Sequence, residues 1–111
     1  MGFNVTSVDL GKAIGSDKKI FESNNVFSPQ DTIYALVSTD GAVSSVTIKA
    51  KWTYGDAGQI INEEEVTISP IGPATTEFHI SKQDGWPLGK YKVGIFVDGI
   101  PAGIQEFEVN R

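Results

Sequence analysis

The clearest alternation of apolar and polar positions in the chain lies between Val43 and Tyr54. Apolar residues occupy every second position and polar residues fill the gaps, so that Val46, Ile48, Ala50, Trp52 and Tyr54 alternate with Thr47, Lys49, Lys51 and Thr53. A period of two places successive side chains on opposite faces of an extended chain. The pattern therefore predicts a half-buried β-strand in which Trp52 faces inward.

The same period recurs after the Gly- and Pro-rich stretch 85–89. Its apolar positions are Tyr91, Val93, Ile95 and Val97, and its polar positions include Lys90 and Lys92. The pair Asp98-Gly99 then predicts a two-residue hairpin turn, because both central positions of such a turn need a positive φ. We expect the returning strand over 100–110. Its inward parity changes between Ile104 and Phe107, which predicts a β-bulge between these two residues.

Shorter runs of the same kind predict the other strands. We expect strands over 4–10 (Val8 and Leu10 inward), 32–38, 59–69 and 75–81 (Thr76, Phe78 and Ile80 inward), with a short edge strand at 20–21 and a turn over 27–31. The strand 32–38 is apolar on both faces, so we place it centrally in its sheet.

The composition agrees with β structure throughout the 111 residues. Val, Ile and Thr are plentiful and Leu is scarce, and β-branched side chains pack well on pleated sheets. The 12 glycines and 5 prolines fall mostly between apolar runs, where turns belong. About seven strands with turns at this spacing predict a single all-β domain over 1–111, an antiparallel β-sandwich of two sheets. Because the chain has no cysteine, the sandwich has no disulfide.

Charge and hydropathy argue against some kinds of partner. The net charge of −5 and the pI near 4.7 oppose binding to nucleic acid, and no apolar run is long enough for insertion into a membrane. The first residues lack the basic and apolar regions of a signal peptide. A chain that starts directly on a strand suggests a segment of a longer, extracytoplasmic precursor, with a free-standing cytoplasmic protein as the other interpretation.

Few residues are candidates for catalysis or metal binding. His79 is the only histidine, and its position beside Glu77 on the outward face predicts an exposed strand residue rather than a metal ligand. Several aspartates, among them Asp17, Asp31, Asp40, Asp84 and Asp98, could together form a calcium site, but turn chemistry explains most of them. We therefore expect no catalytic residues, no metal and no cofactor.

Two groups of side chains are candidates for a partner surface. The first is a set of four lysines on two adjacent strands, Lys49, Lys51, Lys90 and Lys92, which we expect glutamates to flank on both sides. Such a face either compensates its own charge or forms a basic binding patch. The second group is Phe96, Ile100 and Pro101, near the Asp98-Gly99 turn. Trp86 is predicted either to cap the open end of the core or to stand out as a sugar-binding platform.

Several of these motifs resemble immunoglobulin-like domains in the broad sense that includes fibronectin type III modules. Trp52 resembles the core tryptophan of the family, and Gly89-Lys90-Tyr91-Lys92-Val93 resembles the family's G-x-Y-x-C motif, with valine in place of the cysteine. The resemblance implies that Tyr91 bonds to upstream backbone at a tyrosine corner. It also implies a core around Trp52, Tyr91, Val93, Phe78 and Phe107.

The cysteine-free domains that this chain resembles most are appended to bacterial envelope and secreted proteins. The resemblance implies a non-catalytic accessory module, which acts as a spacer or binds a partner protein or neighbouring domains of the same chain. One alternative is a carbohydrate-binding module, which requires at least two of Trp86, Tyr54, Phe96 and Tyr34 to be coplanar and exposed. The other is a protease inhibitor that uses the loop 70–73 or 98–101.

Overall fold

The computed structural model describes residues 3–11 and 25–110, which form eight β-strands and no helix. The strands are β1 (Asn4–Gly11), β2 (Val26–Phe27), β3 (Ile33–Asp40), β4 (Val46–Tyr54), β5 (Gln59–Ile68), β6 (Ala74–Ile80), β7 (Gly89–Val97) and β8 (Ile100–Val109). The short edge strand predicted at 20–21 lies outside the described residues. So does Asp17.

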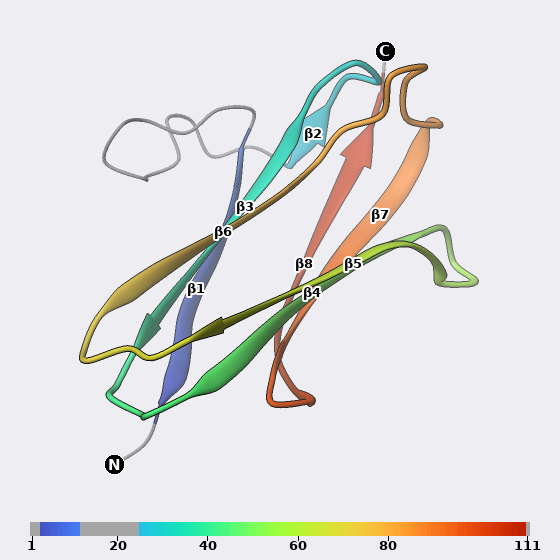
Figure 1. The fold of residues 1–111 in the computed structure, drawn as a ribbon. Helices are drawn as coiled ribbons and strands as arrows, with labels where there is room; N and C mark the ends of the chain where they lie inside the picture. Colours follow the sequence, from blue (N-terminus) through green and yellow to red (C-terminus); the bar gives the residue numbers. More distant parts are fainter. Residues whose placement is uncertain (1–2, 12–24, 111) are drawn as a thin grey trace.

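The strands form two sheets that face each other (Figure 1). One sheet has three strands in the order β1-β3-β6, and the other has five in the order β2-β8-β7-β4-β5. The strand 32–38 was expected to be central, and β3 is the middle strand of its sheet. All named pairings are antiparallel except that of β2 with β8, which is parallel. The predicted all-β sandwich is confirmed.

The space between the sheets is filled by the side chains that the alternation assigns inward. Trp52, Val93 and Phe78 are fully buried, and Tyr91 and Phe107 nearly so. The aromatic rings contact one another: the Phe107 ring stacks on Tyr91 at 5.2 Å between centroids and meets the edge of Trp52 at 6.0 Å. Burial of this apolar surface is the main driving force that holds the two sheets together.

The turn predicted over 27–31 begins one residue later than expected. Phe27 is the last residue of β2 and is buried, and its ring meets Phe107 edge-on at 5.6 Å. The turn itself is closed by Asp31, whose N–H donates to the Ser28 carbonyl at 3.0 Å. A two-residue strand gives too short an alternation to be recognised in the sequence.

The β-bulge in β8 was predicted at the wrong place. The ladder with β7 runs regularly from Gly103 to Val109, and the irregularity lies where Ile95 pairs with Gly103 and Phe96 with Pro101. Ala102 is therefore the extra residue. Because no parity change follows Gly103, Ile104 points to solvent rather than to the core, and it is 62% exposed. The hairpin turn at Asp98-Gly99 is confirmed, with φ of 50° and 85°.

Candidate functional site

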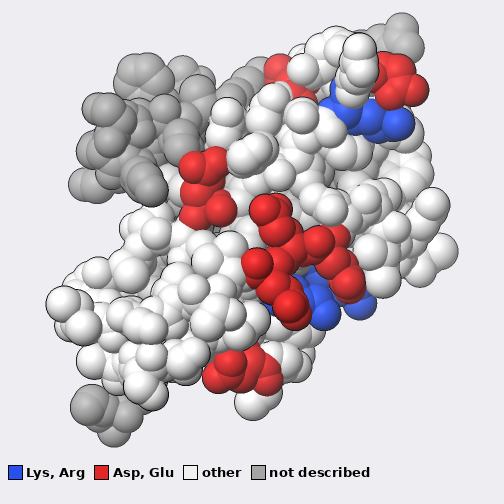
Figure 2. All heavy atoms as spheres, viewed as in Figure 1, with Lys and Arg blue, Asp and Glu red and all other residues white. Residues whose placement is uncertain are grey.

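The outer face of the five-stranded sheet carries the rows of charge that the sequence predicts. Glu63 and Glu65 of β5 lie opposite Lys51 and Lys49 of β4, and on the other side Lys92 of β7 lies opposite Glu106 of β8. Lys49 Nζ is 3.8 Å from Glu63 Oε2, and Lys92 Nζ is 3.9 Å from Glu106 Oε2. Figure 2 shows the acidic side chains gathered beside basic ones over this sheet. This arrangement favours a self-compensating face over a basic patch.

Phe96 is less exposed than the sequence predicts. The ammonium group of Lys49 lies 5.6 Å from the centre of the Phe96 ring, at the distance of a cation–π contact. The ring also lies beside Gly94, since a Cβ added to Gly94 would approach its Cε1 to 3.4 Å. Phe96 is therefore half-buried, held between a lysine and a residue without a side chain.

Apolar side chains continue from Phe96 across β8. Ile104 lies opposite Gly94 and Pro101 lies opposite Phe96, so both share the outer face with Phe96. Ile100 follows at the hairpin, opposite Val97. Ile100 is 68% exposed and Ile104 is 62% exposed. We call Phe96, Ile100, Pro101 and Ile104 the apolar strip. Sequence analysis included three of these residues and missed Ile104, although its shared parity with Glu106 and Glu108 places it on the charged outer face.

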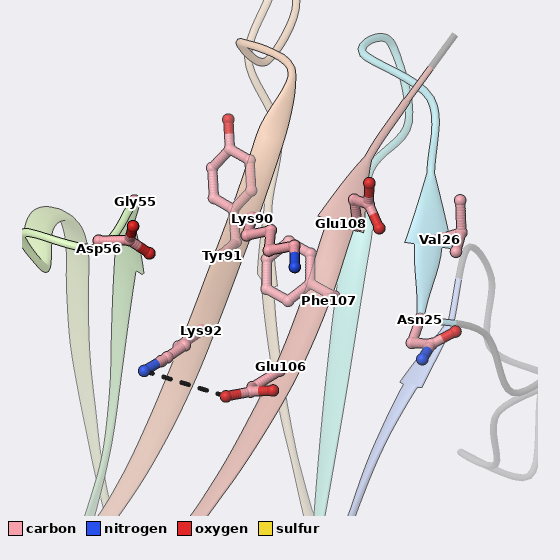
Figure 3. A pocket seen from close by; sticks show the side chains of 10 residues that line it. All are labelled: Asn25, Val26, Gly55, Asp56, Lys90, Tyr91, Lys92, Glu106, Phe107 and Glu108. Carbon is pink, nitrogen blue, oxygen red and sulfur yellow. Dashed lines mark ion pairs between the residues drawn. The ribbon is translucent and has the colours of Figure 1, made fainter.

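A shallow hollow of about 400 Å³ lies on the same face, further toward the C-terminal end of β8. The β4–β5 turn with Asp56 lies on one side of it and Asn25 and Val26 on the other, and Figure 3 shows the pair Lys92–Glu106 across its floor. Lys90 lies opposite Glu108 in the ladder. Three carboxylates (Asp56, Glu106 and Glu108) and two lysines (Lys90 and Lys92) line the hollow, so its charges largely compensate one another.

The end of the core opposite the Asp98-Gly99 hairpin is closed by the β6–β7 loop, which leads into Gly89 beside Val109. Trp86 is 9% exposed and caps the core, as one of the two predictions for it stated. The Tyr91 hydroxyl donates to the Pro87 carbonyl at 2.6 Å, which is the corner bond that the resemblance implies. A second such bond, which no sequence pattern predicts, runs from the Tyr54 hydroxyl to the Leu88 carbonyl at 2.8 Å. Gly89, at φ 138°, leaves room for the Tyr54 ring.

The buried position of Tyr91 makes the fold sensitive to alkaline pH. Burial, with a smaller contribution from Tyr54, raises the pKa of Tyr91 to about 12 from its ordinary value of 10.0. The unfolded chain then loses this proton before the folded one, so stability is unaffected below about pH 10 and falls as the pH rises toward 12. We expect the urea midpoint to fall over this range, and to fall less in Tyr91→Phe. Equal declines in both proteins would contradict the assignment to Tyr91.

The two alternative functions, a carbohydrate-binding module and a protease inhibitor, require different residues to be exposed. Trp86 is buried, and Tyr34, Tyr54 and Phe96 are only half-buried, so the exposed aromatic platform of a carbohydrate-binding module is not found at these residues. In the loop 70–73, Ile71 is 96% exposed, and the loop is fixed by a hydrogen bond from the Val43 N–H to the Pro70 carbonyl at 3.2 Å. This loop therefore displays an apolar side chain, as an inhibitor would.

The candidate catalytic and metal-binding residues have structural roles. His79 Nδ1 lies 2.8 Å from Glu77 Oε2, on the outer face of the smaller sheet. The carboxylate of Asp31 accepts from the Ser28 N–H at 2.7 Å, and Asp98 accepts from the Thr47 N–H at 3.0 Å. Within residues 3–11 and 25–110, no three His, Asp or Glu side chains are grouped so as to hold a metal ion, and no helix is long and apolar enough to span a membrane.

No protein-family model matches the chain, and no curated protein is significantly similar to it. Solved structures are similar in fold. An immunoglobulin-like protein from Pseudomonas aeruginosa matches with a TM-score of 0.61 at 9% identity, over 99% of this chain and 98% of that one. The alkylpurine DNA glycosylase AlkC of Pseudomonas fluorescens, bound to DNA containing an abasic site analog, matches with a TM-score of 0.63 at 12% identity, over 98% of this chain and 30% of that one. A β-glucosidase from Listeria innocua matches with a TM-score of 0.61 at 10% identity, over 99% of this chain and 16% of that one.

These comparisons establish the fold as an immunoglobulin-like β-sandwich. The chain covers nearly all of the P. aeruginosa protein, but less than a third of the glycosylase and about a sixth of the glucosidase. Identities of 9 to 12% are too low to transfer a function, and one fold serves many functions.

Proposed function

We propose that this domain is a non-catalytic accessory module that binds another protein, or a neighbouring domain of a longer chain, through the apolar strip on β7 and β8. The observation that carries the proposal is the exposure of Ile104, which lies with Pro101 and Phe96 on the outer face of the sheet, where the charges are otherwise compensated. An isolated exposed isoleucine is common, but Ile104 shares one face of two adjacent strands with Pro101 and Phe96, and Ile100 is exposed beside them at the hairpin. A contiguous apolar surface with a charged rim is typical of a protein-binding site.

Two further arguments support this function. The similar fold forms 30% of the glycosylase and 16% of the glucosidase, which is the pattern of a module carried by larger proteins. The net charge of −5 disfavours contact with nucleic acid or anionic lipid. We further propose that the module works outside the cytoplasm as part of a longer chain. A spacer role without any partner is the alternative.

The proposal predicts that a charge placed in the strip prevents partner binding. The baits are the wild-type domain, Ile104→Asp and the control Thr75→Asp, an exposed position on the other sheet. Each is cross-linked to proteins of the source cells and their medium, and captured proteins are quantified by mass spectrometry. We expect Ile104→Asp to capture its partner at least about tenfold less than the other two baits, because an aspartate cannot be buried unpaired in an apolar interface.

Equal capture by all three baits would contradict binding through the strip. No reproducible capture by the wild-type domain would favour the spacer. Size-exclusion chromatography with light scattering is run on each bait to measure self-association. A bait that forms dimers would explain the capture of a second copy of the domain itself.

A further inference from the structure

Among the described residues, β8 pairs with β7 from Ile100 to Val109 except at Ala102, and with β2 only at its C-terminal end. β2 pairs with it through Val26–Glu108 and Phe27–Val109. In the part of the chain that the structure describes, no strand pairs with the outer edge of β8 from Ile100 to Glu106. This edge borders the apolar strip directly, since Ile104 belongs to both.

The hydrogen bonds to the β2 segment show which residues of β8 face this edge. The Glu108 N–H donates to the Asn25 carbonyl at 2.9 Å, and the Asn110 N–H donates to the Phe27 carbonyl at 2.8 Å. In an antiparallel ladder, alternate residues direct their N–H and C=O groups to the same edge. Because the ladder with β7 is regular from Gly103 onward, Ile104 and Glu106 direct theirs to the open edge.

The two edges of the five-stranded sheet differ in how they are protected. The opposite edge, β5, carries three consecutive glutamates, 63–65, and charged side chains are a common protection against unwanted strand pairing. The open edge of β8 has no charge from Ile100 to Gln105. The stretch of this edge that is available for pairing is limited at one end by Pro101 and the extra residue Ala102, and at the other end by β2. What remains, Gly103–Glu106, is too short for a stable interface with a second copy, but it suits a short extended peptide.

The neighbouring side chains define the peptide. A strand added here would place one side chain beside Ile104 and, two positions along, another beside Glu106, because side chains on one face repeat every two residues. The Glu106 side chain is 76% exposed and its lysine partner is 3.9 Å away, so its carboxylate is open to a second cation. On the other face of β8, Gln105 Nε2 donates to the Val8 carbonyl at 2.9 Å, which fixes β8 against β1.

We propose that the open edge of β8 binds a short extended segment of a partner protein by strand addition, with an apolar side chain beside Ile104 and a lysine or arginine beside Glu106. The inference rests on the proposed function and specifies how the apolar strip and its edge are used. Main-chain hydrogen bonds to Ile104 and Glu106 supply affinity, and the two side-chain positions supply specificity.

The test separates main-chain pairing from contact with the side chain of Ile104. The probe is a phage-displayed library of random twelve-residue peptides, selected on the wild-type domain, and the enriched peptides are measured by fluorescence anisotropy. Ile104→Ala keeps the edge N–H and removes most of the side chain. Ile104→Pro also removes the N–H, and because that N–H faces away from β7, no bond of the ladder is lost. We expect enriched peptides to carry apolar and basic residues two apart, and Ile104→Pro to bind them at least about tenfold more weakly than Ile104→Ala.

Glu106→Pro is the second variant, should Ile104→Pro fail to fold, and thermal unfolding checks each protein. Equal loss of binding in Ile104→Ala and Ile104→Pro would overturn strand addition while leaving the proposed function intact. If the library yields no peptide but Ile104→Asp still abolishes partner capture, strand addition alone fails. If neither experiment detects binding, both proposals fail.

Discussion

Trp52→Ala is expected to destabilise the domain by about 3–5 kcal/mol, which is a large part of the 5–15 kcal/mol that holds a domain of this size together. Trp52 is the largest fully buried side chain, and its ring meets that of Phe107, which lies near the C-terminus. Removing it leaves a cavity between two sheets that are each held by hydrogen bonds and cannot close freely. Urea denaturation followed by circular dichroism measures the effect, with Lys51→Ala on the outer face as the control.

Trp52→Phe provides a more detailed comparison at the same position. The Trp52 indole N–H is buried without a hydrogen-bond partner. Phenylalanine removes that unsatisfied donor, which offsets part of the loss of apolar contact. We therefore expect Trp52→Phe to cost much less than Trp52→Ala. A loss below about 1 kcal/mol in Trp52→Ala would show that Trp52 is not the centre of the core.

Tyr91→Phe is expected to cost about 1–2 kcal/mol, because it removes the hydrogen bond to the Pro87 carbonyl while the ring stays packed on Phe107. The bond ties the loop 81–88 to the start of β7. Tyr54→Phe removes the neighbouring bond to Leu88 from a more exposed position, and it is the matched control with a smaller expected loss. Urea denaturation of the two single variants and the double variant measures both bonds and their coupling. A larger loss in Tyr54→Phe than in Tyr91→Phe would contradict the main role given to the corner bond.

The fold was predictable from the sequence because its strands are long and one-sided. The alternation 46–54 assigned the inward face of β4 correctly, and Asp98-Gly99 located the β7–β8 turn. Errors arose where the local pattern was weak. Phe27 was assigned to a turn because β2 has only two residues, and the bulge was misplaced because an apolar Ile104 was taken to face the core.

The candidate site was only partly predictable, since it depends on pairing between strands. The sequence named Phe96, Ile100 and Pro101, but the strip is completed by Ile104, whose orientation follows from the register of β8 against β7. Phe96 was expected to be exposed. It is half-buried because Lys49, which lies 47 positions earlier in the chain and on the neighbouring strand, contacts its ring.

The alternation of side chains by itself determined that this chain forms strands with one apolar face, and that such faces must be buried against each other. A period of two is a property of the extended backbone and needs no knowledge of neighbours. Only the tertiary structure decided which strands are neighbours, which stretch of β8 no described strand pairs with, and which apolar residues remain outside. Those features depend on hydrogen bonds between distant segments, and no local pattern encodes them.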